Sequence, residues 1–213
     1  PTISDVVITP DSARPLARPL VCFIDGNWIR TDYFIGYSSS PEAADWHESV
    51  AKDISYTFNT WKIYEKLPPH ITIFYPFNTD NVEGVKGFLK SWTENKSVPG
   101  DFSINDFDHF EDRVVFAKVE TTKGVENFAN DFKDQFGKAF GFANIASDGV
   151  TYENWHPHST LINKLPPEEI NKIWDYVQTL PKPHFILPFD NLTIFKYNGD
   201  DIWVVEETLD LLE

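Results

Sequence analysis

The stretch PPHITIFYPF, residues 68–77, is typical of a β-strand with one exception. Isoleucine, threonine, phenylalanine and tyrosine suit a half-buried pleated surface, and prolines bracket the run. The exception is His70, which opens the strand two residues before Thr72. Because side chains at positions i and i+2 of a strand share a face, His70 and Thr72 are expected to project together, while Ile71 and Ile73 face a core.

The same pattern returns later in the chain, because PHSTL at residues 157–161 repeats the order Pro-His-x-Thr-apolar of PHITI at residues 69–73. Chance gives roughly 0.01 such pentapeptides in this chain, whereas the looser pattern His-x-Ser/Thr arises about 0.8 times. One loose match, beginning at His47, lies in a predicted helix beside Trp46, and we assign it no function. Two full matches, each opening a predicted strand, indicate a repeated functional element.

The composition is that of a packed globular protein. The chain has 213 residues, of which 41% are hydrophobic and 15% aromatic, so it can bury a real core. A formal net charge of −15 argues against a protein that coats nucleic acid, because duplex binding needs many basic contacts to phosphates. A small nucleotide or a single RNA end remains possible, since a few local groups can hold it.

The sequence also bears on compartment. The lone Cys22 cannot form an internal disulfide. No apolar segment approaches the ~20 residues that span a bilayer, and the first twenty residues lack the basic-then-apolar order of a signal peptide. We therefore expect a cytoplasmic protein, acting as a monomer, with residues 1–18 as an N-terminal arm and residues 19–213 as a single domain.

Hydrophobic periodicity predicts a mixture of helices and strands. A strand is expected at about 19–25, followed by a polar loop over 26–40 and a second loop over 141–156; these loops would form binding-site walls. The predicted helices are 41–66, a segment around Val82–Trp92, 122–140, and one that starts at Pro166-Pro167. Further strands are expected at 102–110, 113–119, after His158, near 184–197 and near 201–207. Strands joined by short turns favour an α+β fold with antiparallel sheets.

The paired motifs suggest a specific chemistry. If the two strands lie side by side, two imidazoles and two hydroxyls converge on one cleft. An imidazole titrates near pH 6.5, so one ring can act as general base while the other acts as general acid. Threonine hydroxyls can hold the non-bridging oxygens of a phosphoryl group as its transition state forms. A phosphodiester is the substrate class that fits this set.

The two motifs resemble those of the 2H phosphoesterase superfamily, the two-histidine enzymes that include the 2′,5′ RNA ligase-like proteins and cyclic nucleotide phosphodiesterases. HITIFYPF at 70–77 is similar to the first motif of the 2′,5′ RNA ligase-like branch, and WHPHSTL at 155–161 to the second. FILPFDNLTIFK at 185–196 resembles the closing strands of that family. The likeness spans roughly residues 19–209.

This resemblance implies a bilobal fold with pseudo-two-fold symmetry, in which two antiparallel sheets meet at a central cleft and helices lie outside. It implies a metal-independent phosphodiesterase that uses no cofactor and acts on 2′,3′-cyclic phosphates or 2′–5′ linkages. Carried over to this chain, His70 and His158 are the acid/base pair, and Thr72 and Thr160 bind the phosphate. Which histidine is the base remains open.

Four further residues are candidates for substrate contact. Lys164 follows the second motif, where some family members place a basic residue. Tyr75, Tyr152 and Trp155 could stack on a base, although core packing is the competing interpretation. His156 and His158 form a same-face pair that could bind a transition metal, but the sequence offers no third ligand at a suitable spacing.

Two other functions stay open. The chain could be a binding module that recognises a phosphorylated nucleotide or an RNA end without turning it over. It could also join RNA ends through a 2′–5′ linkage, the reverse reaction, although the acidic charge disfavours extended RNA contact. The expected partner is in each case a small nucleotide or RNA end.

Overall fold

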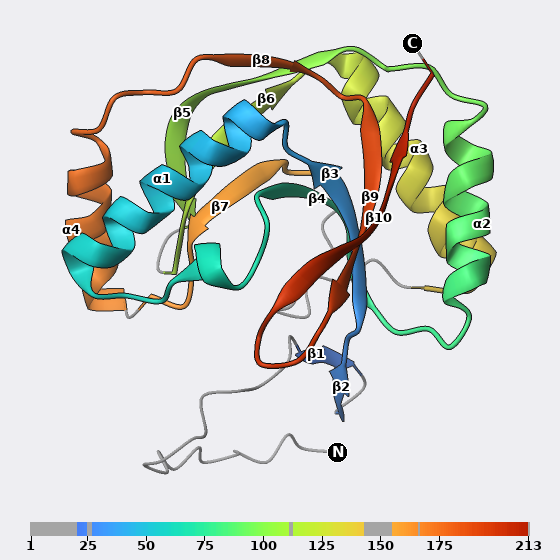
Figure 1. The fold of residues 1–213 in the computed structure, drawn as a ribbon, viewed down its shortest axis with the longest axis horizontal. Helices are drawn as coiled ribbons and strands as arrows, with labels where there is room; N and C mark the ends of the chain where they lie inside the picture. The colour runs from blue at the N-terminus through green and yellow to red at the C-terminus, as the bar shows by residue number, and fades with distance from the viewer. Residues whose placement is uncertain (1–20, 25–26, 111–112, 143–154, 166, 213) are drawn as a thin grey trace, which may run out of the picture.

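The computed structural model describes residues 21–24, 27–110, 113–142, 155–165 and 167–212 (Figure 1). The predicted arm 1–18, most of the predicted loop 141–156, and Tyr152 lie outside these described residues. Within the described part of the chain, none of the helices combines the length and apolar character that crossing a bilayer requires.

The described residues form ten strands, four α-helices and one 3₁₀ turn. The strands are β1 (Val21–Ile24), β2 (Asn27–Arg30), β3 (Tyr33–Ser38), β4 (His70–Phe77), β5 (Asp101–Phe110), β6 (Val114–Thr121), β7 (His158–Ile162), β8 (Phe185–Pro188), β9 (Asn191–Tyr197) and β10 (Trp203–Asp210). The helices are α1 (Pro41–Phe58), α2 (Val82–Thr93), α3 (Lys123–Phe140) and α4 (Pro167–Val177), and the 3₁₀ turn is η1 (Ile63–Glu65).

The strands form two four-stranded antiparallel sheets and a separate β1–β2 pair. One sheet has the order β10-β9-β3-β4 and the other β7-β6-β5-β8. The two motif-bearing strands, β4 and β7, are therefore edge strands, and they contact each other between the sheets (Figure 1). The α+β class and the two antiparallel sheets agree with the expectation from the sequence.

Each sheet carries one pair of helices (Figure 1). Helix α1 contacts β7 and α4, and α4 contacts β6, so this pair covers the β7-β6-β5-β8 sheet. Helix α2 contacts β9 and β10, and α3 contacts β4 and also β6 of the first sheet, on the other side of the molecule. Helix α1 follows β3 in the chain yet packs on the sheet that contains β7, which places residues of α1 directly behind the second motif.

Two predictions for the first third of the chain were wrong. The expected polar loop 26–40 contains β2 and β3, and β3 is the inner strand between β4 and β9. Because both faces of β3 are buried, its sequence YFIGYS shows no polar–apolar alternation. The helix predicted over 41–66 ends at Phe58, because Asn59 adopts the left-handed conformation (φ 51°) that closes α1.

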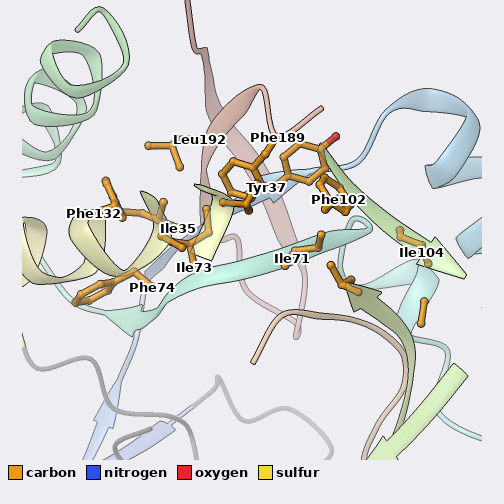
Figure 2. Packing of buried hydrophobic residues seen from close by; sticks show 14 of the residues in the cluster. Ile35, Tyr37, Ile71, Ile73, Phe74, Phe102, Ile104, Phe132, Phe189 and Leu192 are labelled. Carbon is orange, nitrogen blue, oxygen red and sulfur yellow. The ribbon is translucent and has the colours of Figure 1, made fainter. Parts of the chain in front are cut away.

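One hydrophobic cluster extends through both halves of the molecule (Figure 2). It contains Ile71 and Ile73 of β4 and Leu161 of β7, each at most 1% exposed. Phe189, fully buried between β8 and β9, joins the two sheets within it. The predicted inward faces of both motif strands are thus confirmed, and the histidines and threonines occupy the opposite faces.

A second, smaller cluster lies on the other face of the β10-β9-β3-β4 sheet. It consists of Phe34, Phe195, Tyr197 and Trp203, with Leu67 packed against it. Phe34 and Phe195 stack in parallel with ring centroids 4.5 Å apart. This cluster forms the surroundings of the first motif.

Candidate active site

The first motif begins with a histidine whose ring is fixed by its own backbone. His70 Nδ1 lies 2.8 Å from the carbonyl oxygen of Pro68. A carbonyl can only accept, so Nδ1 carries the hydrogen, and in the neutral ring Nε2 is the atom with a free lone pair. Because a residue before proline is restricted to extended conformations, Pro69 holds the Pro68 carbonyl in this direction.

The second motif repeats this arrangement. His158 Nδ1 lies 2.9 Å from the carbonyl oxygen of His156, with Pro157 between the two residues. The same argument fixes the hydrogen on Nδ1 and leaves Nε2 as the free atom. The proline of the pentapeptide therefore has a physical role, because it orients the carbonyl that sets the protonation pattern of the following histidine.

Both rings rest against pairs of phenylalanines. The ring centroid of His70 lies 4.8 Å from that of Phe34 and 5.2 Å from that of Phe195. Those of Phe110 and Phe116 lie 5.0 and 5.1 Å from His158. Packing against rings restricts each imidazole to one orientation. The two half-sites thus share a backbone hydrogen bond and an aromatic backing.

These surroundings disfavour the charged form of each ring. Burial lowers the pKa of His70 to about 4, and the charge of His158 lowers it further, against the Pro68 carbonyl, which raises it. Burial likewise lowers the pKa of His158, where the His156 carbonyl opposes the shift and the charge of His156 adds to it. Both side chains nevertheless remain partly exposed to solvent. The strands that carry the two rings contact each other, which agrees with the effect of the His158 charge on the pKa of His70.

The threonines lie where the motif spacing predicts them. Thr72 and Thr160 are partly exposed and occupy the same strand faces as His70 and His158. Gly36 of β3 pairs with Thr72, and a Cβ atom at Gly36 would lie 2.8 Å from the Ile71 carbonyl oxygen. No side chain from this position of β3 can therefore cover Thr72. The structure brings both histidines and both threonines to two adjacent strands, and their catalytic and phosphate-binding roles stay predictions.

Trp155, predicted to contact substrate, makes structural contacts. Its indole Nε1 donates to the carbonyl oxygen of Thr72 at 2.8 Å, and its ring meets Phe189 edge-on at 6.0 Å. It thereby ties the segment before β7 to the open edge of β4. Tyr75 is half-buried farther along β4. Neither arrangement tests a role in substrate binding.

Lys164 lies just beyond β7 in a left-handed conformation (φ 59°). Its ammonium group is 3.3 Å from an Asp201 carboxylate oxygen and 3.9 Å from the ring centroid of Trp61. Asp201 belongs to the turn between β9 and β10, so Lys164 joins the two sheets at one end of the motif strands. Its predicted contact with substrate would require it to exchange Asp201 for the phosphate.

The structure also reveals a residue to which the sequence pattern assigns no function. His47 of α1 is 6% exposed, and its pKa is lowered to about 4, first by burial and next by the charge of His70. The signal that could have found it is its place in the apolar stripe of α1, beside Val50 and Ile54, where a buried histidine needs an explanation.

A metal centre would need a third ligand beside His156 and His158, whose ring centroids are 6.3 Å apart. Among the described residues, no group of three histidine, cysteine, aspartate or glutamate side chains is placed to hold a metal ion. The rings of both histidines pack against Phe110 and Phe116.

Comparison with solved structures supports the fold. The chain is similar to TT0787 of Thermus thermophilus (TM-score 0.56, 14% identity), over 84% of this chain and 97% of the other. It is also similar to a protein described as a phosphoesterase (TM-score 0.51, 16% identity, 86% and 99% coverage). LigT of E. coli in complex with NADP+ gives a TM-score of 0.51 at 16% identity, with 86% and 98% coverage.

At these identities the likeness establishes the fold alone. No curated protein matches the chain. The profile of one family, described as the 2′-5′ RNA ligase superfamily, matches residues 39–201, which include both motifs and the whole β7-β6-β5-β8 sheet. Since this match covers most of the chain, the protein belongs to the 2′-5′ RNA ligase superfamily, the two-histidine phosphoesterases.

Proposed function

We propose that this protein is a metal-independent phosphodiesterase that opens 2′,3′-cyclic phosphates or cleaves 2′–5′ linkages of small nucleotides. One observation carries the proposal. His70 and His158 each bind a backbone carbonyl through Nδ1, on adjacent strands, so each offers Nε2 for proton transfer. A general base and a general acid that act on one phosphorus atom each need a ring nitrogen that is oriented and available, and Nε2 of each histidine meets this need.

The reaction needs one ring neutral and the other protonated. Nε2 of the neutral ring takes a proton from the attacking water as its oxygen bonds to phosphorus. Nε2–H of the protonated ring gives a proton to the leaving sugar oxygen as its bond to phosphorus breaks. One proton is taken and one is given, so the pair keeps its total charge. The hydroxyls of Thr72 and Thr160 donate to the non-bridging oxygens, where negative charge concentrates.

The lowered pKa values set the pH dependence. In the free protein at pH 7 both rings are mainly neutral, and the singly protonated pair becomes abundant only at lower pH. A bound phosphate anion favours the charged ring and raises its pKa. We therefore expect a bell-shaped profile of kcat/KM with its maximum below pH 7, and a profile of kcat shifted to higher pH. A flat profile of kcat/KM between pH 4 and 8 would contradict paired histidines.

The substrate class follows from charge and from the relatives. With a net charge of −15, the protein has little to attract a long polyanion, whereas a single phosphate needs few groups. LigT of E. coli, which shares this fold, was crystallised with NADP+, a dinucleotide. Mononucleotide cyclic phosphates and short 2′–5′ oligonucleotides are therefore the substrates to try first.

The test is a hydrolysis screen over 2′,3′-cyclic mononucleotides, 2′–5′ dinucleotides and cyclic oligonucleotides. His70→Ala and His158→Ala are each expected to lower kcat by about 10²–10⁴, the usual contribution of a general acid or base. His184→Ala is the matched control, because His184 is exposed and lies outside both motifs. EDTA should leave the rate unchanged.

Other outcomes identify the competing functions. Full activity in either motif variant would overturn the assigned roles. Loss of activity with EDTA would indicate a metal site involving His156. Tight binding of a 2′-phosphate nucleotide without turnover of any substrate would indicate a binding module, and formation of a 2′–5′ linkage from cyclic-phosphate ends would indicate RNA joining.

A further inference from the structure

Helix α1 packs against β7 (Figure 1), and His47 is one of the buried residues of this helix. It is 6% exposed and shares its buried side of the helix with Ala43, Ala51 and Ile54, which are fully or almost fully buried. A leucine would suit these neighbours better than an imidazole, because burying a polar ring without partners costs free energy.

The contact between α1 and β7 contains two polar atoms without partners. Nε2 of His47 and Oγ of Ser159 are both buried, and neither has a hydrogen-bond partner among the described residues. Ser159 is 2% exposed and points away from the face that carries His158 and Thr160. Each unsatisfied buried group destabilises the folded protein. Departures of this kind from good packing concentrate at functional sites.

The imidazole of His47 also interacts with both motifs. Helix α1, which carries His47, packs on β7; burial has the largest effect on the His47 pKa, the charge of His70 also lowers it, and the backbone of Thr160 and Ser159 raises it. A neutral imidazole carries one N–H donor, which is the group that can bind a carbonyl. One side chain is therefore affected by the backbone of the second motif and by the imidazole of the first.

The edge strands explain why such a contact matters. Within the described residues, β4 pairs only with β3 and β7 only with β6, so no ladder of hydrogen bonds fixes β4 relative to β7. Trp155 donates its indole N–H to the Thr72 carbonyl on β4. Trp155 thus links the segment before β7 to β4, while His47 is buried on the helix that packs on β7.

We propose that His47 is a positioning residue, which holds the backbone of β7 at the second motif and thereby sets the distance between its His158–Thr160 pair and His70. The proposal rests on the proposed function, since it assumes that both motifs act on one phosphate. Its loss should lower kcat more than it changes KM, because misplacement of reacting groups by a fraction of an ångström affects the transition state most.

Three variants and a control test this role. His47→Leu removes both ring nitrogens at similar volume, His47→Asn keeps an N–H near the position of Nδ1, and Ser159→Ala removes the second unpartnered atom. His109→Leu is the matched control. His109 also has a buried, unpartnered ring nitrogen, and its ring packs on Trp174 of α4, with centroids 4.6 Å apart.

The readouts are Tm, kcat and KM on a cyclic mononucleotide, and the imidazole NMR signals of His70 and His158. For His47→Leu we expect an unchanged or higher Tm, a roughly tenfold lower kcat and a KM within about threefold of wild type. His47→Asn should recover most of kcat, and Ser159→Ala should leave it within about threefold. His109→Leu should leave kcat unchanged. A residue with only a structural role would not give a variant whose Tm is unchanged or higher while its kcat is lower.

Two results would overturn the proposal. The first is a kcat within twofold of wild type in His47→Leu, and the second is an equal loss of kcat in His109→Leu. If the wild-type protein turns over no substrate, the proposed function fails, and the NMR signals still test the positioning role. Displacement of the His70 and His158 signals in His47→Leu but not in His109→Leu would support it, and unchanged signals would refute it.

Discussion

The starts of β4 and β7 repeat one local geometry in different surroundings. His70 rests on Phe34 and Phe195, which are 3% and 0% exposed and belong to a closed aromatic cluster. This apolar enclosure opposes protonation, and so does the charge that His158 carries when His70 titrates. The first half-site is therefore built to keep its imidazole neutral.

The second half-site is more open. His158 rests on Phe116, which is buried, and on Phe110, which is only half-buried. Its neighbour His156 is exposed. The charge of His158 acts on His70, whereas His156 is the charged neighbour that acts on His158. The two histidines share one backbone geometry but have different neighbours. Different neighbours move the pKa values of two catalytic groups apart, which makes one the acid and the other the base. We expect His70 to be the base and His158 the acid.

The largest expected effect tests this assignment. A leaving group of low pKa needs no proton, so a general acid becomes dispensable for it. On a 2′–5′ dinucleotide, His70→Ala and His158→Ala should each lower kcat by about 10²–10⁴. On a nucleoside p-nitrophenyl phosphodiester, the kcat of His158→Ala should return close to that of wild type, while the kcat of His70→Ala should stay low. Recovery by His70→Ala instead would reverse the two roles.

The next effect concerns stability in acid. Between pH 6.5 and about 4 the unfolded chain protonates residue 70 while the folded protein does not, because the folded pKa is about 4. Protonation therefore favours unfolding, and the free energy of unfolding falls as pH decreases through this window. The difference between the His70 pKa in the unfolded and the folded protein corresponds to at most about 3 kcal/mol in the free energy of unfolding. In urea titrations at pH 7 and pH 4, His70→Asn should lose more of this acid sensitivity than His158→Asn.

His184→Asn is the control for that measurement, because His184 is exposed and lies outside both motifs. An equal change in the His70 and His158 variants would remove the difference between the two half-sites. A pH dependence unaltered by His70→Asn would show that its imidazole is not held neutral.

A smaller effect is expected for the prolines that precede the histidines. Pro157→Ala frees the backbone of His156, so its carbonyl should bind His158 Nδ1 less often, with about a tenfold loss of kcat. Pro69→Ala should cost less, because Pro68 still has a φ angle fixed by its own ring. Steady-state kinetics of both variants measure the difference. Equal losses would mean that the ring of Pro68 contributes nothing to the orientation of its carbonyl.

The smallest effect concerns Lys164, the asymmetric element of the site. If Lys164 exchanges Asp201 for the substrate phosphate, Asp201→Asn should lower KM and Lys164→Ala should raise it, each by about threefold, the range of an exposed ion pair. Lys138→Ala is a suitable control, because Lys138 forms an exposed pair with Asp134 on α3. If KM stays unchanged in both variants, Lys164 serves only to join the two sheets.

Much of this arrangement could be predicted from the sequence. The strand HITIFYPF, the repeat PHSTL and the inward-facing Ile71, Ile73 and Leu161 all follow from the two-residue period of a strand. Helices α2, α3 and α4 follow from their apolar stripes and their start signals. These features depend on residues that are close in the sequence, so the periodic pattern of apolar residues predicts them.

The features that the sequence did not predict depend on contacts between distant residues. The sequence predicts a loop where β3 lies, because the burial of β3 on both faces comes from β4, β9 and the second aromatic cluster, which no local pattern shows. His47 has no function in the sequence pattern because its importance arises only when α1 crosses to the other sheet. Trp155 is a candidate for stacking by its residue type, while its bond to Thr72 links residues far apart in the chain.

The connectivity of the two sheets has a consequence for biosynthesis. Strands β5–β8 follow one another in the chain, whereas β3, which also pairs with β4, pairs with a strand, β9, that comes after them. The β5–β8 sheet can thus assemble as soon as its own residues leave the ribosome, but the other sheet must wait until β9 and β10 close a long loop around it. Because β9 brings Phe195 beside His70, the first half-site is expected to be completed after the second, once β9 has been synthesised.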